Sequence, residues 1–399
     1  MTTTKRFAPP ARVRDPQHSI VYRNEREFCG WPFICGFWTN ADSHLLVAFQ
    51  RKPCAYTDPG DVHHDEVAKV GPKIVLARSR NRGASWEIGK GGNSSDDDRS
   101  GSDVLFDLSA DPQALFADAP SDYSREPRVD FNDADVLVAS GATPDYFRPH
   151  SQAWIRVSVD GGSTWRAPIL APRVGWPSLS GHASALVRPD GVSLIFMTAV
   201  SDDGWKRRPV VYASVDGGAC WTFLSAMTPA VDDGAAIGDR SVGLRFAAHR
   251  YFYPRGIALP DGRLLASIRC QRDPTSVLWT EIFASDDGGR TWAFRSRVND
   301  WGAPGDLVRM RDGRIVCVYG YRLPPFGVRA RVSEDDGRTW GREWIVRDDG
   351  GSWDLGYPRV VEHVPGKLLT VYYMNCRDDP IQMNGGVRHI AQTIFTPQT

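Results

Sequence analysis

The chain has 399 residues, and its 48 lysines and arginines balance its 48 aspartates and glutamates. A balanced charge gives no overall field that would attract nucleic acid or an anionic membrane, so any recognition of anions must rest on local clusters. Apolar residues make up 41% of the chain and there are 14 tryptophans, which excludes a disordered protein and allows a large core with aromatic surfaces.

The amino-terminal segment, Met1 to Asp15, is basic but no apolar stretch follows it, and no window approaches about 18 uninterrupted apolar residues. These features predict no membrane span and a cytoplasmic location, unless a leader has been trimmed. The cysteines are odd in number and lack Cys-x-x-Cys spacing, which favours reduced thiols over a zinc site. No nucleotide-binding loop or nucleophile elbow appears, so neither a cofactor nor a metal ion is expected.

Six stretches of the chain have the pattern of an apolar run, a tight turn and a second apolar run. In chain order they lie at 33–49, 129–139, 183–197, 256–268, 307–319 and 360–373. The segment 387–395 is expected to be a late strand of the sixth unit, and Ser19 to Tyr22 could pair with it and close a ring. The polar stretch 87–125 lacks alternation and is interpreted as a surface insertion between the first two units.

A short motif follows five of the six units, with the common form Ser-x-Asp-x-Gly-x-x-Trp. Its copies lie at 79–86, 158–165, 214–221, 285–292 and 333–340. Asp or Asn can bond its own turn backbone, Gly adopts positive φ, and Trp covers the hairpin with a large apolar face. This repetition predicts one all-β domain, a six-bladed β-propeller of four-stranded antiparallel blades.

Strand direction locates the candidate site. In an antiparallel blade with strands a, b, c and d, the a/b and c/d turns share one face of the disc. The boxed motifs therefore lie on one face, and the site is expected on the other, at the starts of a, the ends of b and the b/c loops.

The b/c loop of the first unit concentrates titratable residues, in the run His63-His64-Asp65. Cleavage of a glycosidic bond needs a proton donor at the leaving oxygen, and a histidine or a carboxyl group can supply it. His64 and Asp65 are the candidate catalytic residues, with His63 beside them. A solvated polar loop is the alternative. Adjacent side chains rarely converge on one metal ion.

Several arginines lie where strands meet the predicted site face. Arg255, Arg269 and Arg322 are expected to converge near the channel, since guanidinium groups can hold a carboxylate by two parallel hydrogen bonds. Arg51 and Arg359 are further candidates for substrate binding. The alternative is that these arginines form salt bridges between blades.

Strand a of the sixth unit begins near Asp354 and Tyr357, and Tyr357 is a candidate nucleophile that would need a base such as Asp354 or Asp306. The alternative is that Tyr357 packs between blades. The remaining candidates lie at the starts of other a strands. Glu126 is a candidate catalytic carboxylate, and Arg128, His182, Tyr253 and Trp31 are candidates for binding a sugar.

The boxed motif and its position after a hairpin resemble the Asp-box (BNR) repeats of the sialidase superfamily, over roughly residues 20 to 395. This resemblance implies a six-bladed propeller that cleaves terminal sialic acids with an arginine triad, a Tyr–Glu nucleophile pair and an Asp acid/base. Arg269 and Arg322 resemble two of the triad, and Tyr357 and Asp65 resemble the nucleophile and the acid. Trp31 stands where the third arginine would be, and 302–307 contains no Glu.

Three functions remain open. The first is a glycoside hydrolase that acts on an acidic or modified terminal sugar. The second is a polysaccharide lyase on a uronate-containing glycan, in which Tyr or His removes the proton next to a carboxylate. The third is a glycan-binding propeller without catalysis. All three predict a glycan or oligosaccharide as partner and no nucleic acid or membrane, and they leave the oligomeric state open.

Overall fold

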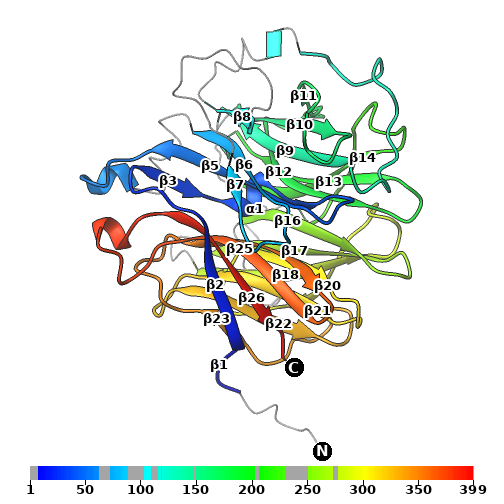
Figure 1. Ribbon diagram of the computed structural model, residues 1–399. Helices are drawn as coiled ribbons and strands as arrows, with labels where there is room; N and C mark the ends of the chain where they lie inside the picture. Colours follow the sequence, from blue (N-terminus) through cyan, green and yellow to red (C-terminus); the bar gives the residue numbers. More distant parts are fainter. Residues whose placement is uncertain are drawn as a thin grey trace, which may run out of the picture.

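The computed structural model arranges six small antiparallel sheets around a central axis (Figure 1). It describes residues 8–62, 72–88, 103–108, 116–117, 119–144, 146–147, 150–202, 206–229, 250–272 and 277–398. The fold is therefore the six-bladed propeller that the repeats predict.

The first three blades follow the chain order, and β12 of blade three packs against β9 of blade two. Blade one contains β3 (Glu27–Gly30), β4 (Phe37–Thr39), β5 (Leu45–Pro53), β6 (Lys73–Ser79), β7 (Glu87–Ile88) and β8 (Val104–Asp107). Blade two contains β9 (Leu137–Thr143), β10 (Gln152–Ser158) and β11 (Ile169–Leu170). Blade three contains β12 (Ser178–Val187), β13 (Ser193–Val200), β14 (Arg207–Ser214) and β15 (Thr222–Ala226).

The last three blades complete the ring. Blade four contains β16 (Arg250–Ala258), β17 (Leu264–Arg272), β18 (Val277–Ser285) and β19 (Ala293–Arg297). Blade five contains β20 (Gly305–Arg309), β21 (Ile315–Tyr321), β22 (Gly327–Ser333) and β23 (Trp344–Arg347). Blade six contains β24 (Gly356–Val364), β25 (Lys367–Met374), β26 (His389–Thr396) and the amino-terminal strand β2 (Arg14–Tyr22). Short 3-10 turns lie at Pro59–Val62 and Met383–Gly385.

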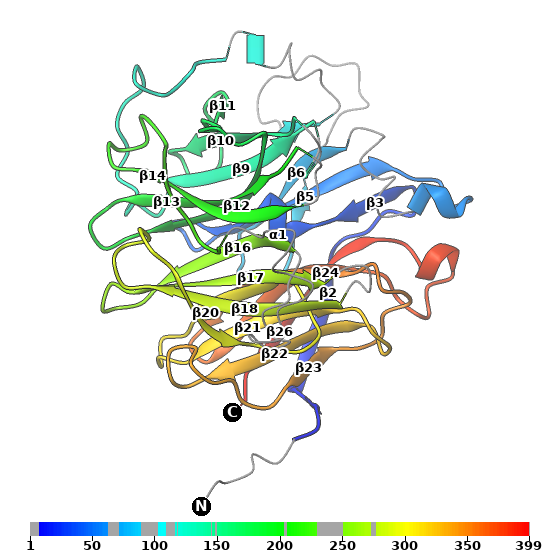
Figure 2. The same cartoon turned by 180° about the vertical axis from the view of Figure 1, so that it is seen from behind.

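Closure of the ring uses the amino terminus, as predicted. Strand β2 pairs antiparallel with β26, and the two lie side by side in Figures 1 and 2. The pairing covers the edge that β26 would otherwise expose. The chain then adds a contact that the sequence did not suggest, because β1 (Ala11–Arg12) pairs in parallel with β23 of blade five.

Two expectations for the region between blades one and two are wrong. A strand-turn-strand unit was expected at 129–139, but 124–136 contains no strand, only its second strand forms as β9, and blade two has three strands among the described residues. The chain there bonds the boxed turn of blade three instead, through Val129 N–H to the Gly217 carbonyl at 2.9 Å. The expected insertion also contains β8, which pairs with β6 and so belongs to blade one.

The boxed turns form the hydrogen bonds that their residue types predict. Gly289 N–H donates to the Ser285 hydroxyl at 2.8 Å, and that hydroxyl donates to Asp287 Oδ1 at 2.8 Å. Thr291 donates its N–H to Oδ1 and its hydroxyl to Oδ2, at 2.9 and 2.6 Å. The copies at 158–165, 214–221 and 333–340 share the Ser, Gly and Asp contacts, and Asn81 takes the Asp role in blade one.

The tryptophan of each box contacts the preceding blade. Trp165 lies 5.6 Å from Trp38 of blade one, and Trp292 lies 6.0 Å from Phe196 of blade three. Trp340 donates its indole N–H to the Ser296 hydroxyl of blade four. The boxes therefore join neighbouring blades, in addition to covering their own hairpins.

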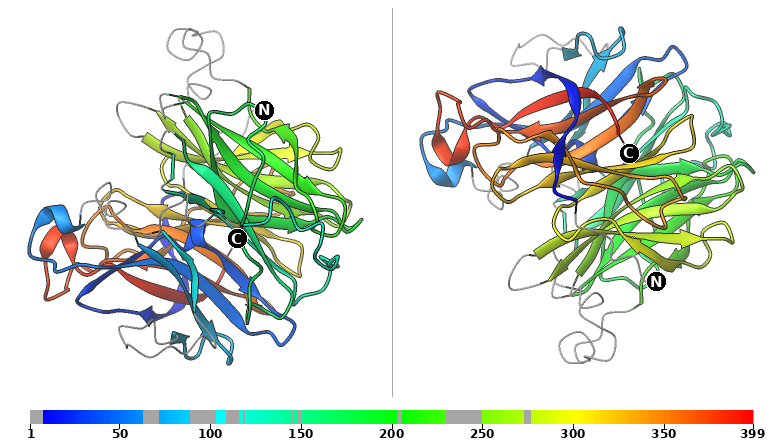
Figure 3. Two further views of the ribbon diagram at one scale, coloured as in Figure 1. Left: turned by 90° about the horizontal axis from the view of Figure 1, so that it is seen from above. Right: turned by 90° about the horizontal axis from the view of Figure 1, so that it is seen from below.

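A one-turn helix, labelled α1, lies near the middle of the molecule in Figures 1 and 2, and Figure 3 shows the same ribbon from above and from below. This helix, α1 (Pro32–Cys35), interrupts the inner strand of blade one and packs against β12 and β24. Pro32 suits the first helical position because its missing N–H is not needed there. Gly36 ends the helix at φ 136°, and a Cβ there would lie 1.9 Å from the Trp38 ring, so only glycine fits.

In the described part of the chain no helix is long and apolar enough to cross a membrane.

The face that carries the boxes also carries the a/b turns, because Arg263 of one such turn binds Asp336 of a box at 2.6 Å. The opposite face therefore holds the starts of the inner strands, as strand direction predicts.

Candidate active site

Three inner strands place an aromatic side chain at the site-face end of the ring. Trp31, Tyr253 and Tyr357 have φ values of 59°, 57° and 50°, in the left-handed region, and each is followed by proline. Such a conformation costs about 1–2 kcal/mol for a residue other than glycine. The pairing register of β16 shifts between Phe252 and Arg255, and that of β24 shifts between Gly356 and Arg359. These irregularities turn both tyrosines toward the axis.

The hydroxyl of Tyr357 is the centre of the site. Arg269 Nη1 donates to it at 3.0 Å, and the hydroxyl oxygen of Tyr253 lies 3.5 Å away. The guanidinium carbon of Arg322 lies 5.2 Å from the centre of the Tyr357 ring. The sequence placed all four of these residues on the site face and expected Arg269 and Arg322 to converge with Arg255. The structure brings Arg269 and Arg322 together with Tyr253 and Tyr357 instead.

A close approach of two backbones makes this contact possible. A Cβ on Gly356 would lie 2.7 Å from the Cα of Gly320, so β24 and β21 meet with no side chain between them. Tyr357 follows the first glycine, and Arg322 lies two residues after the second. Arg322 also donates to the Leu355 carbonyl at 3.2 Å and to the Tyr373 hydroxyl at 3.3 Å, which fixes it beside Tyr357.

A third arginine, which the sequence analysis did not select, joins the cluster. Arg207 begins β14, and its guanidinium carbon lies 4.1 Å from the Phe147 ring centre and 4.8 Å from that of Phe252. Arg269 stacks on the same Phe252 ring at 4.5 Å. The signal in the sequence was weak, because Arg207 is one of several basic residues in the run Lys206-Arg207-Arg208.

The charge of the cluster is positive. No carboxylate in the described ranges forms an ion pair with Arg207, Arg269 or Arg322. Burial, followed by repulsion from Arg250, lowers the pKa of Arg207 to about 9, so it remains cationic at neutral pH. Burial works against the charge of Arg322, but Tyr373, Tyr357 and Asp354 raise its pKa above the ordinary value. Three guanidinium groups with one carboxylate nearby leave a net positive charge, which favours an anionic ligand.

The two tyrosines differ in acidity. Burial alone would raise the pKa of Tyr357, but the charges of Arg269 and Arg322 outweigh it, and its pKa lies below the ordinary value of 10.0. Burial and the neighbouring Tyr357 hold the pKa of Tyr253 well above its usual range. Tyr357 is therefore the group that ionises first, and Tyr253 keeps its proton.

Asp354 lies behind the cluster and is already paired. It accepts a hydrogen bond from Tyr373 at 2.6 Å, and Arg388 Nε lies 3.3 Å from its second oxygen. Asp354 therefore holds Tyr373 and, through it, Arg322. The structure places no contact between Asp354 and the Tyr357 hydroxyl, so its expected role as a base for Tyr357 has no geometric support.

His182 lies on the other side of Tyr253. Its Nε2 is 3.0 Å from the Thr198 hydroxyl, and its ring meets the Tyr253 ring edge-on at 4.9 Å. Burial, with Arg207 nearby, lowers the pKa of His182 to about 3, so the imidazole is neutral. Trp31 closes the opposite side by stacking on Phe28 and lying 5.9 Å from Tyr373.

Three predicted site residues have a different role. Asp306 is fully buried, and its two oxygens bind Arg255 at 2.9 Å and Arg359 at 3.3 Å. Asp306 also accepts the Val360 N–H at 2.8 Å. Arg359 further donates to the carbonyls of Phe33, Phe37 and Ala183, which belong to blades one and three. Asp306, Arg255 and Arg359 thus hold the inner strands together, and the expectation that Asp306 serves as a base is corrected.

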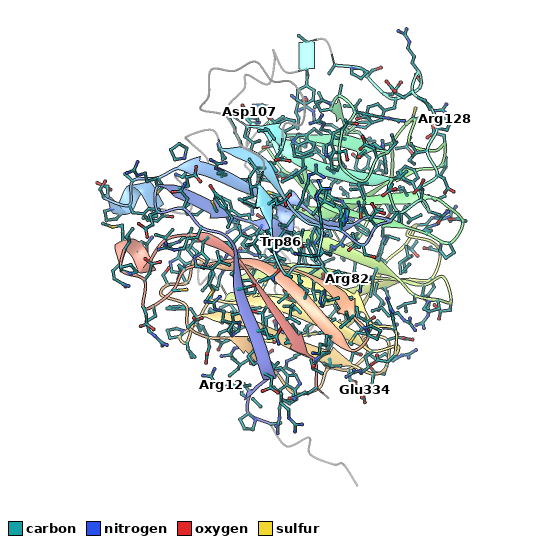
Figure 4. All side chains as sticks on the ribbon, viewed as in Figure 1. Arg12, Arg82, Trp86, Asp107, Arg128 and Glu334 are labelled. Atoms are coloured by element: carbon teal, nitrogen blue, oxygen red, sulfur yellow. The ribbon has the colours of Figure 1, made fainter. Side chains whose placement is uncertain are left out.

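The structure separates three other candidates from the cluster. Glu126 and Arg128 lie on the coil that bonds the boxed turn of blade three, and Figure 4 shows Arg128 at the outer edge of the molecule. The expectation that they begin an inner strand failed because that strand does not form. Arg51 pairs with Glu27 at 2.7 Å inside blade one. His63, His64 and Asp65 lie outside the described residues.

Within the described ranges no group of three or more His, Cys, Asp or Glu side chains could hold a metal ion. The chemistry that the Tyr357 cluster itself offers is that of a phenol set between cationic groups. A phenol of lowered pKa can act as a nucleophile, and the surrounding arginines can hold an anion beside it.

Six blades, five of them with an Asp-box turn on the same face, define the class of Asp-box propellers, and here a tyrosine–arginine cluster lies at the opposite ends of the strands. The chain belongs to the BNR repeat-like domain family, whose model matches residues 137–369, more than half of its length. No curated protein matches the chain.

Solved structures share the fold at low sequence identity. A protein of unknown function from Dyadobacter fermentans DSM 18053 is 18% identical, with a TM-score of 0.67 over 97% of this chain and 100% of that one. A Hadza microbial sialidase is 15% identical, with a TM-score of 0.58 over 92% of this chain and 66% of its own. The Trypanosoma rangeli sialidase, in complex with the inhibitor DANA, is 13% identical, with a TM-score of 0.54 over 96% of this chain and 60% of its own.

Proposed function

We propose that the chain is a glycoside hydrolase of sialidase-like fold that acts on an acidic or modified terminal sugar. The observation that carries the proposal is the contact of Tyr357 with Arg269, beside Arg322 and within a cluster that has an excess of positive charge. The likeness to sialidases concerns the fold, and the chain spans about two thirds or less of their length. The activity therefore rests on the chemistry of these side chains.

The arginines would bind the carboxylate of the sugar. Arg269 and Arg322 come from blades four and five, and Arg207 from blade three, so they approach from different directions. Guanidinium groups form parallel hydrogen bonds to a carboxylate, which fixes the orientation of the ring that carries it. Arg207 would supply the third cation of the cluster, since Trp31 stands at the first-blade position where the family pattern has an arginine.

Tyr357 would be the nucleophile. Its oxygen would form a bond to the anomeric carbon while the bond to the leaving oxygen breaks, and an acid would protonate that oxygen. His64 and Asp65 remain the predicted acids. Water would then break the bond between tyrosine and sugar, and the acid residue would recover its proton from that water.

A product-resolved substrate screen tests the proposal. Aryl glycosides and oligosaccharides of sialic acids, uronic acids and neutral sugars would be incubated with the wild type, Tyr357→Phe and the control Tyr22→Phe, whose tyrosine lies in the closing strand. We expect hydrolysis of acidic sugars only, reduced at least about a hundredfold by Tyr357→Phe and unchanged by Tyr22→Phe.

Other outcomes of this screen would contradict the proposal. An unsaturated product would identify a polysaccharide lyase, which has no support among the compared structures. Binding of acidic glycans without turnover would identify a glycan-binding propeller. Two features of the sequence favour this alternative: Trp31 stands where the family pattern has an arginine, and 302–307 contains no Glu.

A further inference from the structure

Tyr357 lacks a carboxylate partner among the residues that the structure describes. Its hydroxyl contacts Arg269 and Tyr253, and the nearest acidic candidates are used elsewhere. Asp306 binds two arginines of the inner strands, and Asp354 binds Tyr373 and Arg388. If Tyr357 is a nucleophile, another arrangement has to make its oxygen reactive.

The second tyrosine is held opposite the first by a repeated segment. Tyr253-Pro254-Arg255 begins near the start of β16, and Tyr357-Pro358-Arg359 near the start of β24. In both segments the tyrosine has left-handed φ and the arginine binds Asp306. One carboxylate on β20 therefore fixes both segments, and their rings meet edge-on at 5.4 Å.

We infer that Tyr253 is a positioning residue for the nucleophile, whose hydroxyl donates a hydrogen bond to an ionised Tyr357 in the place where a carboxylate partner would lie. This inference rests on the proposed function. Tyr357 gives its proton to solvent before substrate binds. Its oxygen then attacks the anomeric carbon as the leaving oxygen departs and takes a proton from the acid, while Tyr253 keeps its own proton throughout.

The charges around Tyr357 favour this ionised state. The titratable and charged groups that face the tyrosine pair come from four strands, β12, β14, β17 and β25, and from the segments beside β21 and β24. They are Arg269, Arg322, Arg207, Tyr373, His182 and Asp354. Three are cationic, His182 is neutral, and the single carboxylate is paired with Arg388. An anion on Tyr357 is thus stabilised by charge and by two hydrogen-bond donors.

Titration of tyrosinate absorption tests the inference without any substrate. The wild type should lose one tyrosine proton below the ordinary value of about 10, and Tyr357→Phe should abolish that step. Tyr253→Phe should move it up by about one pH unit, as expected for the loss of one hydrogen bond to an anion. The matched control is Tyr251→Phe, on the same strand, because Tyr251 is near Cys270 and Glu281.

A rescue variant keeps the test valid if Tyr253→Phe does not fold. Replacing Tyr253 with para-aminophenylalanine restores an N–H donor and should leave the early step near its wild-type position. The inference would be overturned if no tyrosine of the wild type ionised below the ordinary value of about 10. It would also be overturned if neither Tyr253 variant moved that ionisation, or if both variants moved it equally. None of these results depends on hydrolysis, so they are separate from a failure of the substrate screen.

Activity supplies a second readout once a substrate is known. The rising limb of the kcat/KM profile against pH reports ionisation of the free enzyme. It should move upward in Tyr253→Phe by the same amount as the titration, with about a tenfold loss of kcat/KM below that limb. A purely structural role for Tyr253 would lower activity without moving the limb, and that result would contradict the inference.

Discussion

Arg255 and Arg359 bind opposite oxygens of the same carboxylate, that of the buried Asp306, at 2.9 and 3.3 Å. The three residues come from the inner strands of blades four, six and five, so one ion cluster ties three blades together.

Replacing Asp306 with asparagine should destabilise the protein strongly. Two buried guanidinium groups would lose their common counterion, and breaking a buried pair costs about 3–5 kcal/mol. Denaturant unfolding would show a lower midpoint, with Asp312→Asn in the exposed turn of the same hairpin as the control. Equal midpoints for the two variants would contradict the role of Asp306 as an anchor.

The boxed turns should contribute to stability and not to activity. Asp287→Ala removes the acceptor of two backbone N–H groups and two hydroxyls, so it should lower the free energy of unfolding by about 1–2 kcal/mol. The control is its exposed neighbour, Asp286→Ala. If Asp287→Ala lost glycosidase activity while its unfolding midpoint stayed unchanged, the box would have a role beyond the scaffold.

His182 should make stability depend on pH in acid. Burial lowers its pKa in the folded state to about 3, whereas the ordinary value is 6.5. Between these values the unfolded chain binds a proton that the folded chain does not bind. The stability that is present above pH 6.5 is therefore lost as the pH falls toward 3, by up to about 1.4 kcal/mol per pH unit.

The variant His182→Gln should flatten this dependence, and unfolding midpoints measured from neutral to acid pH would show it. Part of the slope should remain because burial also lowers the pKa of His389, to about 4, with the same sign. An unchanged slope would mean that His182 is protonated in the folded protein.

Arg207 should affect the affinity for acidic ligands only. Arg207→Gln removes one cation from the cluster and should weaken binding of a monosaccharide acid about tenfold, with little effect on a neutral sugar. Calorimetric titration would measure this. Arg208→Gln is the matched control, because Arg208 donates to the Thr228 carbonyl at 2.7 Å. Equal losses in both variants would argue against a specific anion site.

The local motifs were sufficient to predict the scaffold. Each box satisfies its own hydrogen bonds within eight residues, so Ser285 to Trp292 forms the same turn wherever it is placed in a blade. Six strand-turn-strand units, five of them followed by a box, predicted six blades, and Ser19 to Tyr22 was correctly expected to close the ring. The missing inner strand of blade two was not predictable, because 129–139 has a suitable pattern but its first residues bond a turn of the next blade.

The candidate site, like the fold, has one part that the sequence predicts and one part that it does not. The turn motifs place Tyr253, Tyr357, Arg269 and Arg322 at one end of their strands, because strand direction follows from the position of the turns. No local pattern predicts that Arg255 and Arg359 turn to Asp306 while the tyrosines beside them meet at the axis. That choice depends on left-handed φ values and on contacts between blades, which residues far apart in the chain supply together.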